Sequence, residues 1–282
     1  VEYQSDASRG GTLGVTVDLA AGTAIDGFGD TDTLSNIEVI RGSGQDDVLT
    51  GDGNANTFRG FRGNDLIDGQ DGFDTADYFK DAIYGGTGAG GVTVDLVAGT
   101  AIDGFGDTDT LLNIEDVSGT NFADTITGDG ANNLIQGFDG ADTLTGGAGN
   151  DQLFAGGGTD TAVFSGNLAD YTITDNGGGS VTVTDNVGSD GTDLLQDVEF
   201  LQFADVTITI GDPTEGPNTL IGTAAADTID ALGGDDVIAG LGGNDVIEGG
   251  AGFDEADYSL DAANGGTLGV TVDVPGGSGT AI

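Results

Sequence analysis

The chain has 282 residues, of which 56 are glycine, and its 49 acidic residues face only five basic ones, giving a formal net charge of −44. So few Lys and Arg exclude a nucleic-acid-binding protein, because phosphates are bound through cationic side chains. The absence of Cys and His excludes disulfide staples and removes the commonest general base and transition-metal ligand. No apolar run approaches the length of a membrane-spanning helix.

Two interpretations of such a charge compete. An acidic chain can stay disordered through self-repulsion, or it can fold once divalent cations supply the missing positive charge. Hydrophobic residues make up 37% of the chain and recur at fixed phase, which favours the second interpretation. Carboxylates on neighbouring strands, about 5 Å apart, repel by roughly 1 kcal/mol per pair in water and by more where they are buried. The repeats are therefore predicted to be disordered without cations.

The first segment, residues 1–41, is predicted to form leading strands. Val15, Val17 and Leu19 alternate with polar residues, as in a half-buried strand, and a Gly/Asp-rich turn follows. The stretch from 14 to 34 recurs with one difference at 91–111. Residues 79–118 are therefore predicted to be the leading strands of a second unit.

Nonapeptides repeat in three blocks, residues 42–78, 119–163 and 213–258, and 13 of them align. Glycine heads most of them, the eighth place is always apolar, and the sixth place is Asp in eleven and Asn in two. The sixth-place residues are Asp47, Asn56, Asp65, Asp74, Asp124, Asn133, Asp142, Asp151, Asp160, Asp227, Asp236, Asp245 and Asp254. An oxygen ligand and a core residue at fixed phase indicate that each nonapeptide is one rung of a solenoid.

Each rung is predicted to be a six-residue turn followed by a three-residue strand. Two rungs complete one coil, so turns two rungs apart stack on the same side. A cation between stacked turns would take two carboxylates and several carbonyls, the six or more oxygens that Ca²⁺ prefers. Glycine at the fourth place would let the turn adopt positive φ and aim its carbonyls at the ion. The sequence therefore predicts several Ca²⁺ ions.

The remaining segments are also predicted to be β-structure. Residues 164–212 contain YTITD and SVTVTD on either side of a Gly-rich turn, which indicates a β-hairpin. The stretch 211–218, with Pro213 and Pro217, is the best linker candidate. Residues 259–282 are expected to start a further, truncated unit, because 257–274 repeats 2–19 and the chain reads as a piece of a longer array. Helical periodicity is absent, so the chain is predicted to be all-β.

The nonapeptides resemble those of the RTX, or haemolysin-type, calcium-binding repeat family. The resemblance implies a right-handed parallel β-roll (a β-solenoid), Ca²⁺-induced folding, and export by a type I secretion system, so that the protein is extracellular or on the cell surface. It implies that each ion takes the second- and fourth-place carbonyls and the Asp of one turn, with the first- and third-place carbonyls and the Asp of the turn two rungs on. The implied sets are Phe138, Gly140 and Asp142 with Ala155, Gly157 and Asp160; Leu232, Gly234 and Asp236 with Gly249, Ala251 and Asp254; and Thr223, Ala225 and Asp227 with Gly240, Gly242 and Asp245. The remaining sixth-place aspartates, Asp47, Asp65, Asp74, Asp124 and Asp151, are further candidate metal ligands.

Some rungs depart from the family pattern. The fourth place is not glycine in the opening rungs, where it is Gln45, Asn54, Phe122, Ala131 and Ala225. These turns are expected to present their carbonyls less well, and Asn56 and Asn133 to bind more weakly because they are neutral. The later rungs of each block are expected to hold the strongest sites.

Two other acidic features leave alternatives open. The identical segments IDGFGDTDT at 25–33 and 102–110 would form either extra Ca²⁺ sites or solvated turns. Glu38, Glu115 and Glu199 lie in apolar runs, and the first two fall nine residues before a sixth-place Asp. We expect these glutamates to serve the first rung of a block as a ligand or a cap.

The predicted function is a non-catalytic, calcium-binding structural segment of a large secreted or cell-surface bacterial protein. Paired carboxylates also occur in glycoside hydrolases, but here every pair repeats with the fold and no Trp is present to stack a sugar. A solenoid has open ends, so self-association into a homo-oligomer, layer or filament is a further hypothesis. The alternative function is an accessory module of a type I-secreted enzyme such as a protease, lipase or polysaccharide-modifying protein.

Overall fold

A computed structural model describes residues 1–79, 90–210, 219–222, 228–231, 235–250 and 252–258. The chain divides into two compact units, residues 1–212 and 213–282. The described residues are almost entirely β-structure, with one short helix, α1 (Asp6–Arg9), and one 3₁₀ turn, η1 (Leu168–Asp170). No helix among them is long and apolar enough to cross a membrane. The prediction of an all-β fold built from a parallel β-roll is confirmed.

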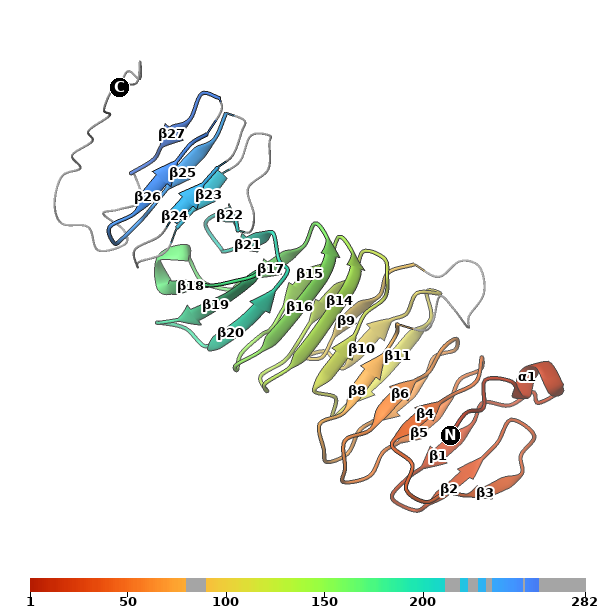
Figure 1. The fold of residues 1–282 in the computed structure, drawn as a ribbon. Coiled ribbons are helices and arrows are strands. Elements are labelled where there is room, and N and C mark those ends of the chain that lie inside the picture. The colour runs from red at the N-terminus through yellow and green to blue at the C-terminus, as the bar shows by residue number, and fades with distance from the viewer. Residues whose placement is uncertain (80–89, 211–218, 223–227, 232–234, 251, 259–282) are drawn as a thin grey trace. The chain divides into compact units, whose positions relative to one another are not determined.

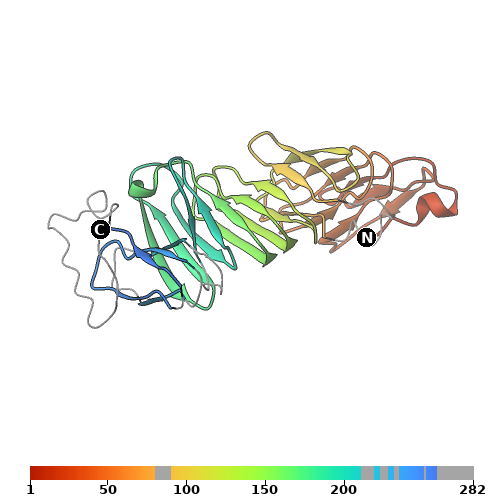
Figure 2. The same cartoon turned by 90° about the horizontal axis from the view of Figure 1, so that it is seen from above.

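The first unit is built from two sheets whose strands follow one another along the roll (Figures 1 and 2). In spatial order, the first sheet contains β22 (Thr207–Thr209), β21 (Phe200–Gln202), β17 (Thr161–Val163), β15 (Thr143–Thr145), β13 (Thr125–Thr127), β9 (Thr93–Asp95), β10 (Thr100–Ile102), β11 (Thr108–Leu112), β7 (Leu66–Asp68), β5 (Val48–Thr50), β1 (Thr16–Asp18), β2 (Thr23–Ile25) and β3 (Thr31–Thr33). The second contains β18 (Tyr171–Gly177), β19 (Ser180–Asp185), β20 (Thr192–Gln196), β16 (Gln152–Gly158), β14 (Leu134–Gly140), β12 (Asp116–Ser118), β8 (Thr75–Asp77), β6 (Thr57–Arg59) and β4 (Val39–Arg41).

Consecutive nonapeptides alternate between the two sheets. Strands two rungs apart pair in parallel and in register, so that Leu49 lies beside Ile67 in one sheet and Ile135 beside Leu153 in the other. Strands this short present one inward side chain each, and the inward position is the eighth place of the repeat. The eighth-place side chains of the first two blocks are at most 1% exposed: Leu49, Phe58, Ile67, Ala76, Ile126, Ile135, Leu144, Leu153 and Ala162. They form the thin core of the roll.

The leading strands also connect one nonapeptide block to the next. In the second leading segment, residues 79–118, the strands β9, β10 and β11 form an antiparallel meander. The two outer strands of this meander also pair with nonapeptide strands. β11 pairs in parallel with β7 of the preceding block, and β9 pairs in parallel with β13 of the following block. The meander therefore joins the two blocks into one continuous sheet.

The far end of the first unit is finished by antiparallel strands. β18 and β19 form the hairpin predicted at 171–185, and β19 continues onto β20, which stacks on the last nonapeptide strand of that sheet. Phe164, Tyr171 and Phe203 pack together here with ring centroids 5.0–5.4 Å apart.

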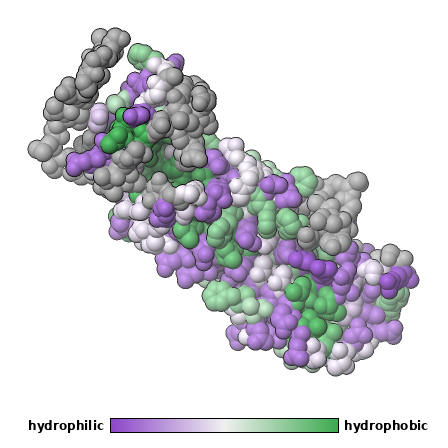
Figure 3. Space-filling view, in the orientation of Figure 1, coloured by the Kyte–Doolittle hydropathy of each residue, from purple (hydrophilic) through white to green (hydrophobic). Residues whose placement is uncertain are grey.

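On the visible surface, hydrophilic and apolar side chains are interspersed (Figure 3).

The second unit repeats the nonapeptide pairing on a smaller scale. β23 (Thr219–Ile221), β25 (Val237–Ala239) and β27 (Glu255–Ala256) are parallel neighbours, and β24 (Thr228–Asp230) pairs in parallel with β26 (Val246–Glu248). The predicted truncated unit at 259–282 and the predicted linker at 211–218 lie outside the described residues.

Candidate metal centre

Two classes of turn occur in the roll, and the residue at the fourth place separates them. Where the fourth place is glycine, both the second- and fourth-place residues have positive φ. The described pairs are Phe61 and Gly63, Gln70 and Gly72, Phe138 and Gly140, Gly147 and Gly149, Gly156 and Gly158, Leu241 and Gly243, and Gly250 and Gly252. These are termed glycine turns. The four other described turns, at residues 42–47, 51–56, 119–124 and 128–133, have neither residue at positive φ and are termed closed turns.

The sixth-place residues form ladders of hydrogen bonds along the stacked turns. The backbone N–H of each sixth-place residue donates to the Oδ1 atom of the aspartate two rungs on. In the first unit these distances are 2.7–2.8 Å, for Asp47 to Asp65, Asn56 to Asp74, Asp124 to Asp142, Asn133 to Asp151 and Asp142 to Asp160. One oxygen of each aspartate is therefore fixed by the backbone of its neighbour.

The second oxygen distinguishes the glycine turns. In all five glycine turns of the first unit the aspartate is at most 2% exposed, and its Oδ2 atom is buried with no hydrogen-bond partner among the described residues. The five aspartates are Asp65, Asp74, Asp142, Asp151 and Asp160. A buried acceptor without a donor costs about 1–3 kcal/mol, and more when it is charged. A cation bound between the stacked turns would be a common partner for these five oxygens.

In the closed turns, the protein itself occupies the sixth-place oxygens. The second-place N–H donates back to the sixth-place side chain at 2.6–2.9 Å, from Ser43 to Asp47, Asp52 to Asn56, Thr120 to Asp124 and Asp129 to Asn133. Asp124 also accepts from the Thr120 hydroxyl at 2.9 Å and from Val92 N at 2.7 Å. Asp47 is held in the same way by Ser43 and Val15. Asp47 and Asp124, although predicted as ligands, therefore do not offer a buried oxygen that lacks a donor.

First-place glycine leaves room for the carboxylate in four of the five glycine turns of the first unit, whereas the turn that ends at Asp160 opens with Ala155. A Cβ atom on Gly60, Gly137 or Gly146 would overlap the Oδ2 atom of Asp65, Asp142 or Asp151 respectively. The carboxylate thus lies directly against the Cα of the residue that opens its turn. This contact keeps Oδ2 inside the turn, facing the backbone rather than solvent.

Burial makes these carboxylates unfavourable as bare anions. Burial raises the pKa of Asp142 and of Asp151 from an ordinary value of 3.8 to about 6. Burial, together with the nearby charges of Asp47 and Asp109, raises the pKa of Asp65 to about 9. A cation beside Oδ2 would reverse these shifts, because it stabilises the ionised form.

The ladders continue beyond the nonapeptides. Asp65 N donates to Asp109 Oδ1 at 3.0 Å, and Asp74 N donates to Glu115 Oε2 at 3.0 Å. At the far end of the unit, Asp151 N donates to Asp193 Oδ1 at 2.9 Å and Asp160 N donates to Glu199 Oε2 at 2.7 Å.

Glu115 and Glu199 therefore occupy the sixth place of a rung, whereas Glu38 is exposed. The sequence analysis did not predict that Asp193 continues a ladder. Its signal is the same acid-x-apolar spacing, with Leu195 in the inward position next to Leu153.

The IDGFGDTDT segments close on themselves. In both copies the first Asp accepts two backbone N–H groups, from Phe105 and Asp107 to Asp103 and from Phe28 and Asp30 to Asp26, at 2.8–3.0 Å. Asp107 and Asp109 accept backbone N–H groups of Gly63 and Asp65. Turn closure and contact with β7 thus account for most of these acids, while Asp103 keeps one buried oxygen without a donor among the described residues.

The predicted ligand set around Asp142 and Asp160 is brought together. Phe138 pairs with Gly156 and Gly140 with Gly158, so the two turns lie against each other in register. Ala155, Gly157 and Asp160 belong to the later of the two turns, and their role as ligands stays a prediction. No group of three or more acidic side chains suited to a metal ion occurs in the described part of the chain, so an ion here would take two carboxylates and complete its coordination with carbonyls, which fits Ca²⁺.

Only part of the third block can be placed. Thr223, Ala225, Asp227, Leu232, Gly234 and Ala251 lie outside the described residues. Asp236 is 1% exposed, and its N–H donates to Asp254 Oδ1 at 3.2 Å, which continues the ladder seen in the first unit. Gly240, Gly242 and Asp245 lie in the turn before β26, and Gly249 opens the next one.

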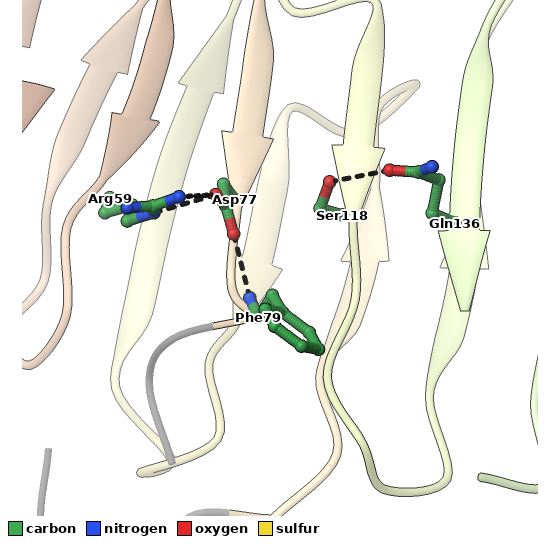
Figure 4. A network of polar contacts seen from close by, with 5 residues as sticks. All are labelled: Arg59, Asp77, Phe79, Ser118 and Gln136. Atoms are coloured by element: carbon green, nitrogen blue, oxygen red, sulfur yellow. Dashed lines mark hydrogen bonds and ion pairs between the residues drawn. The ribbon is translucent and has the colours of Figure 1, made fainter. Parts of the chain in front are cut away.

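A second polar feature lies on the outer face of the second sheet. A cavity of about 270 Å³ is lined by residues of β4, β6, β8, β12 and β14. Arg59 Nε donates to Asp77 at 2.7 Å, Phe79 N donates to Asp77 at 3.0 Å, and Ser118 donates to Gln136 at 3.3 Å (Figure 4). These polar groups satisfy one another, so the feature is part of the sheet surface rather than a reactive site.

Comparisons with known proteins agree with the geometry of the turns. Residues 38–76, 118–153, 127–162, 214–247 and 221–256 match the family of the RTX calcium-binding nonapeptide repeat. No curated protein matches the chain. Among 23 matching chains of solved structures is the extracellular lipase LipA from Serratia marcescens, at 20% identity and a TM-score of 0.30, over 50% of this chain and 27% of the lipase. The chain thus spans about a quarter of that protein, and a likeness this distant carries no argument about function.

Proposed function

We propose that this chain, whose nonapeptides match the RTX calcium-binding repeat over residues 38–76, 118–162 and 214–256, is a non-catalytic structural segment that folds when calcium binds outside the cell. The observation that carries the proposal is the set of five buried Oδ2 atoms that lack a donor among the described residues, one in each glycine turn of the first unit. Bound calcium would supply positive charge between these oxygens and the carbonyls of the stacked turn.

The protein's own groups prepare each site. The backbone N–H ladder holds Oδ1, and the two residues at positive φ set the turn. First-place glycine makes room for Oδ2 in all of these turns except the one that opens with Ala155. Because the rungs depend on neighbours for their core, filling one site favours the next, and folding should be cooperative along a block. At the low calcium of a bacterial cytosol the glycine turns would stay unfolded, which suits export as an extended chain.

A structural role is supported by the repetition of the acidic pairs. Every carboxylate pair recurs with the coil, whereas a catalytic pair would be singular, and the chain has no His or Cys to assist. We therefore propose a segment of a secreted or cell-surface bacterial protein, with type I secretion as its route.

Calcium titration of the metal-free chain, followed by far-UV circular dichroism, tests the proposal, with magnesium as the matched control. The β-signal should rise cooperatively with calcium and stay low at equal magnesium, since Mg²⁺ needs strict octahedral geometry and loses water reluctantly. A full β-signal in the metal-free chain that calcium leaves unchanged would contradict the proposal.

A further inference from the structure

Asp103 is a buried acid that lies outside every nonapeptide. It follows β10 in the turn that leads to β11, and it is 2% exposed. Its Oδ1 atom closes this turn by accepting the backbone N–H groups of Phe105 at 2.9 Å and Asp107 at 2.8 Å. Its Oδ2 atom is buried and has no hydrogen-bond partner among the described residues. This oxygen therefore lacks the donor or cation that a buried carboxylate needs.

The turn of Asp103 packs against the glycine turn of Asp65. Since Asp65 Oδ2 lies against Gly60, where a Cβ atom would overlap it, this oxygen is at the first place of its turn. Three hydrogen bonds join residues 44 positions apart: Gly63 N to Asp107 Oδ2 (3.1 Å), Thr108 N to Asn64 Oδ1 (3.0 Å) and Asp65 N to Asp109 Oδ1 (3.0 Å). The same offset sets Gly104 beside Gly60, and Asp103 immediately precedes Gly104. Asp65 and Asp103 are therefore neighbours at one end of the stacked turns, and they are termed the junction pair.

The two aspartates that flank the junction pair already have donors on both oxygens. Asp47 Oδ2 accepts from Ser43 N at 2.6 Å, and its Oδ1 accepts from the Ser43 hydroxyl at 2.8 Å. Asp109 Oδ1 accepts from Asp65 N, and its Oδ2 accepts from the Tyr78 hydroxyl at 3.2 Å. The junction pair therefore differs from its neighbours, because it keeps two buried oxygens without a donor among the described residues.

Burial and mutual repulsion make the junction pair unfavourable as two bare anions. Burial, and after it the charges of Asp47, Asp109 and Asp103, raises the pKa of Asp65 to about 9. Burial and the charge of Asp103 raise the pKa of Asp109 to about 7. Asp103 is thus close enough to act on both acids through its charge, and a cation beside it would be attracted by all three.

No basic side chain bonds to Asp103 Oδ2 in the described part of the chain. Arg62 belongs to the adjoining glycine turn, but its guanidinium lies over the Phe105 ring, 4.2 Å from the ring centroid. The positive charge that this oxygen needs would therefore come from outside the protein.

We propose that a calcium ion binds between these two turns, to Oδ2 of Asp65 and Oδ2 of Asp103, with backbone carbonyls completing its coordination. Ca²⁺ suits such a site because it takes six or more oxygen ligands in a flexible arrangement. One carboxylate comes from the repeat and the other from the meander, so the spacing of the nonapeptides does not predict this site. The inference rests on the proposed function, because the turn of Asp65 is one of those assigned to calcium there.

Such an ion would fasten the second meander to block 1. The same meander pairs in parallel with β13 of block 2 through β9, so the two blocks are joined through it. Calcium would then hold blocks 1 and 2 in one roll, in addition to holding the turns within each block.

Asp103→Asn tests the site through the number of bound ions. Asparagine keeps an oxygen that accepts the two N–H groups of its turn, but it removes the charged oxygen that would bind calcium. Equilibrium dialysis of the full chain, at the calcium concentration that just saturates the wild type, should show one ion fewer. The matched control is Asp107→Asn in the same turn, where an amide oxygen still accepts Gly63 N. This control should bind as many ions as the wild type.

Crystals of the wild-type chain grown in calcium provide a measurement that needs no substitution. Anomalous difference density should show a peak about 2.3–2.6 Å from Oδ2 of both Asp65 and Asp103, the range of Ca²⁺–oxygen distances. This measurement decides the question if Asp103→Asn does not reach the β-signal of the wild type in calcium.

The outcomes separate this site from the proposed function. Three results would overturn the site alone, while the circular dichroism of the wild type still responds to calcium. These are equal ion numbers in Asp103→Asn and the wild type, loss of an ion from both variants, and the absence of a peak beside Asp103. A wild-type chain whose circular dichroism does not respond to calcium would overturn the proposed function, and the site with it.

Discussion

Block 2 contains both classes of turn side by side, so its two halves can be compared directly. In residues 119–136 the second-place N–H groups reach back to Asp124 and Asn133, and the protein satisfies its own acceptors. In residues 137–163 the turns open to positive φ, and Asp142, Asp151 and Asp160 keep a buried oxygen without a donor. The difference teaches that the roll contains turns that satisfy their own acceptors and turns that leave one carboxylate oxygen without a donor among the described residues. The two classes differ at the fourth place of the repeat, which is glycine only in the second class, and we propose that calcium serves that class.

Removing calcium should produce the largest effect and should divide the block. In a chelator the glycine turns lose the ion that holds their carboxylates together, so amide hydrogen exchange in residues 137–163 should accelerate by about 100-fold or more. The closed turns of residues 119–136 should keep more of their protection. Hydrogen exchange read by mass spectrometry checks this, and uniform loss across the block would remove the distinction between the two classes.

Adding a side chain at a fourth-place glycine should cost less but remain large. Gly149 has φ of 122°, and a Cβ there would overlap the carbonyl oxygen of Ala131 in the turn below. Gly149→Ala should therefore lower the free energy of unfolding in calcium by about 1–3 kcal/mol.

The matched control is Ala131→Gly, at the fourth place of the closed turn it stacks on. This change should cost less than about 1 kcal/mol, because it only adds flexibility to the unfolded chain. Chemical denaturation in calcium measures both variants. Equal losses would show that the glycine turn has no special backbone requirement.

Neutralising one carboxylate should affect calcium binding in one class of turn only. Asp151→Asn removes a charged ligand oxygen and should weaken calcium binding by about tenfold, which corresponds to about 1.4 kcal/mol. Asp124→Asn places an amide where Thr120 and Val92 donate, so it should lower stability while leaving the calcium affinity of the folded block unchanged. Isothermal titration calorimetry beside denaturation separates the two results, and a similar loss of affinity in both variants would contradict the assignment.

Acidity should produce the smallest effect, with opposite signs in the two states. The pKa values of Asp142 and Asp151 are raised to about 6 in the metal-free fold. A raised pKa stabilises the fold below the ordinary value of 3.8 and ceases to do so as pH rises through 6. The metal-free chain should therefore gain β-signal as the pH falls from 7.5 to 4.5.

In calcium the direction reverses. Protons compete with the ion for the same oxygens, so the calcium midpoint should rise as pH falls through 6. Circular dichroism at several pH values measures both trends. A calcium midpoint that stays constant across this range would contradict the idea that the ion binds these carboxylates.

The spacing of the repeat predicts much of the core and of the stacking of the turns. The phase of the apolar eighth place predicted the core, and the phase of the sixth place predicted which residues stack, because both follow from a fixed coil length. The non-glycine fourth places marked the opening turns as different, and the backbone at their second and fourth places does differ. What the phase could not reveal is that Thr120 and Ser43 would close those turns with their own backbone, since that depends on the φ of the second place.

The acids outside the nonapeptides were harder to recognise. Asp109 and Asp193 stack on aspartates 44 and 42 residues away, distances set by an intervening meander or hairpin rather than by the repeat. Each still lies two positions before an inward leucine, Leu111 or Leu195. That short pattern is too common to identify a rung until the pairing of the strands is known.

Anomalous diffraction from crystals of the chain grown in calcium is the most direct test of the role assigned to the glycine turns. Difference peaks should lie beside the Oδ2 atoms of Asp142 and Asp160, between the stacked turns, and should be missing beside Asp124. A well-formed roll without peaks between the glycine turns, or with equal peaks at the closed turns, would contradict the account.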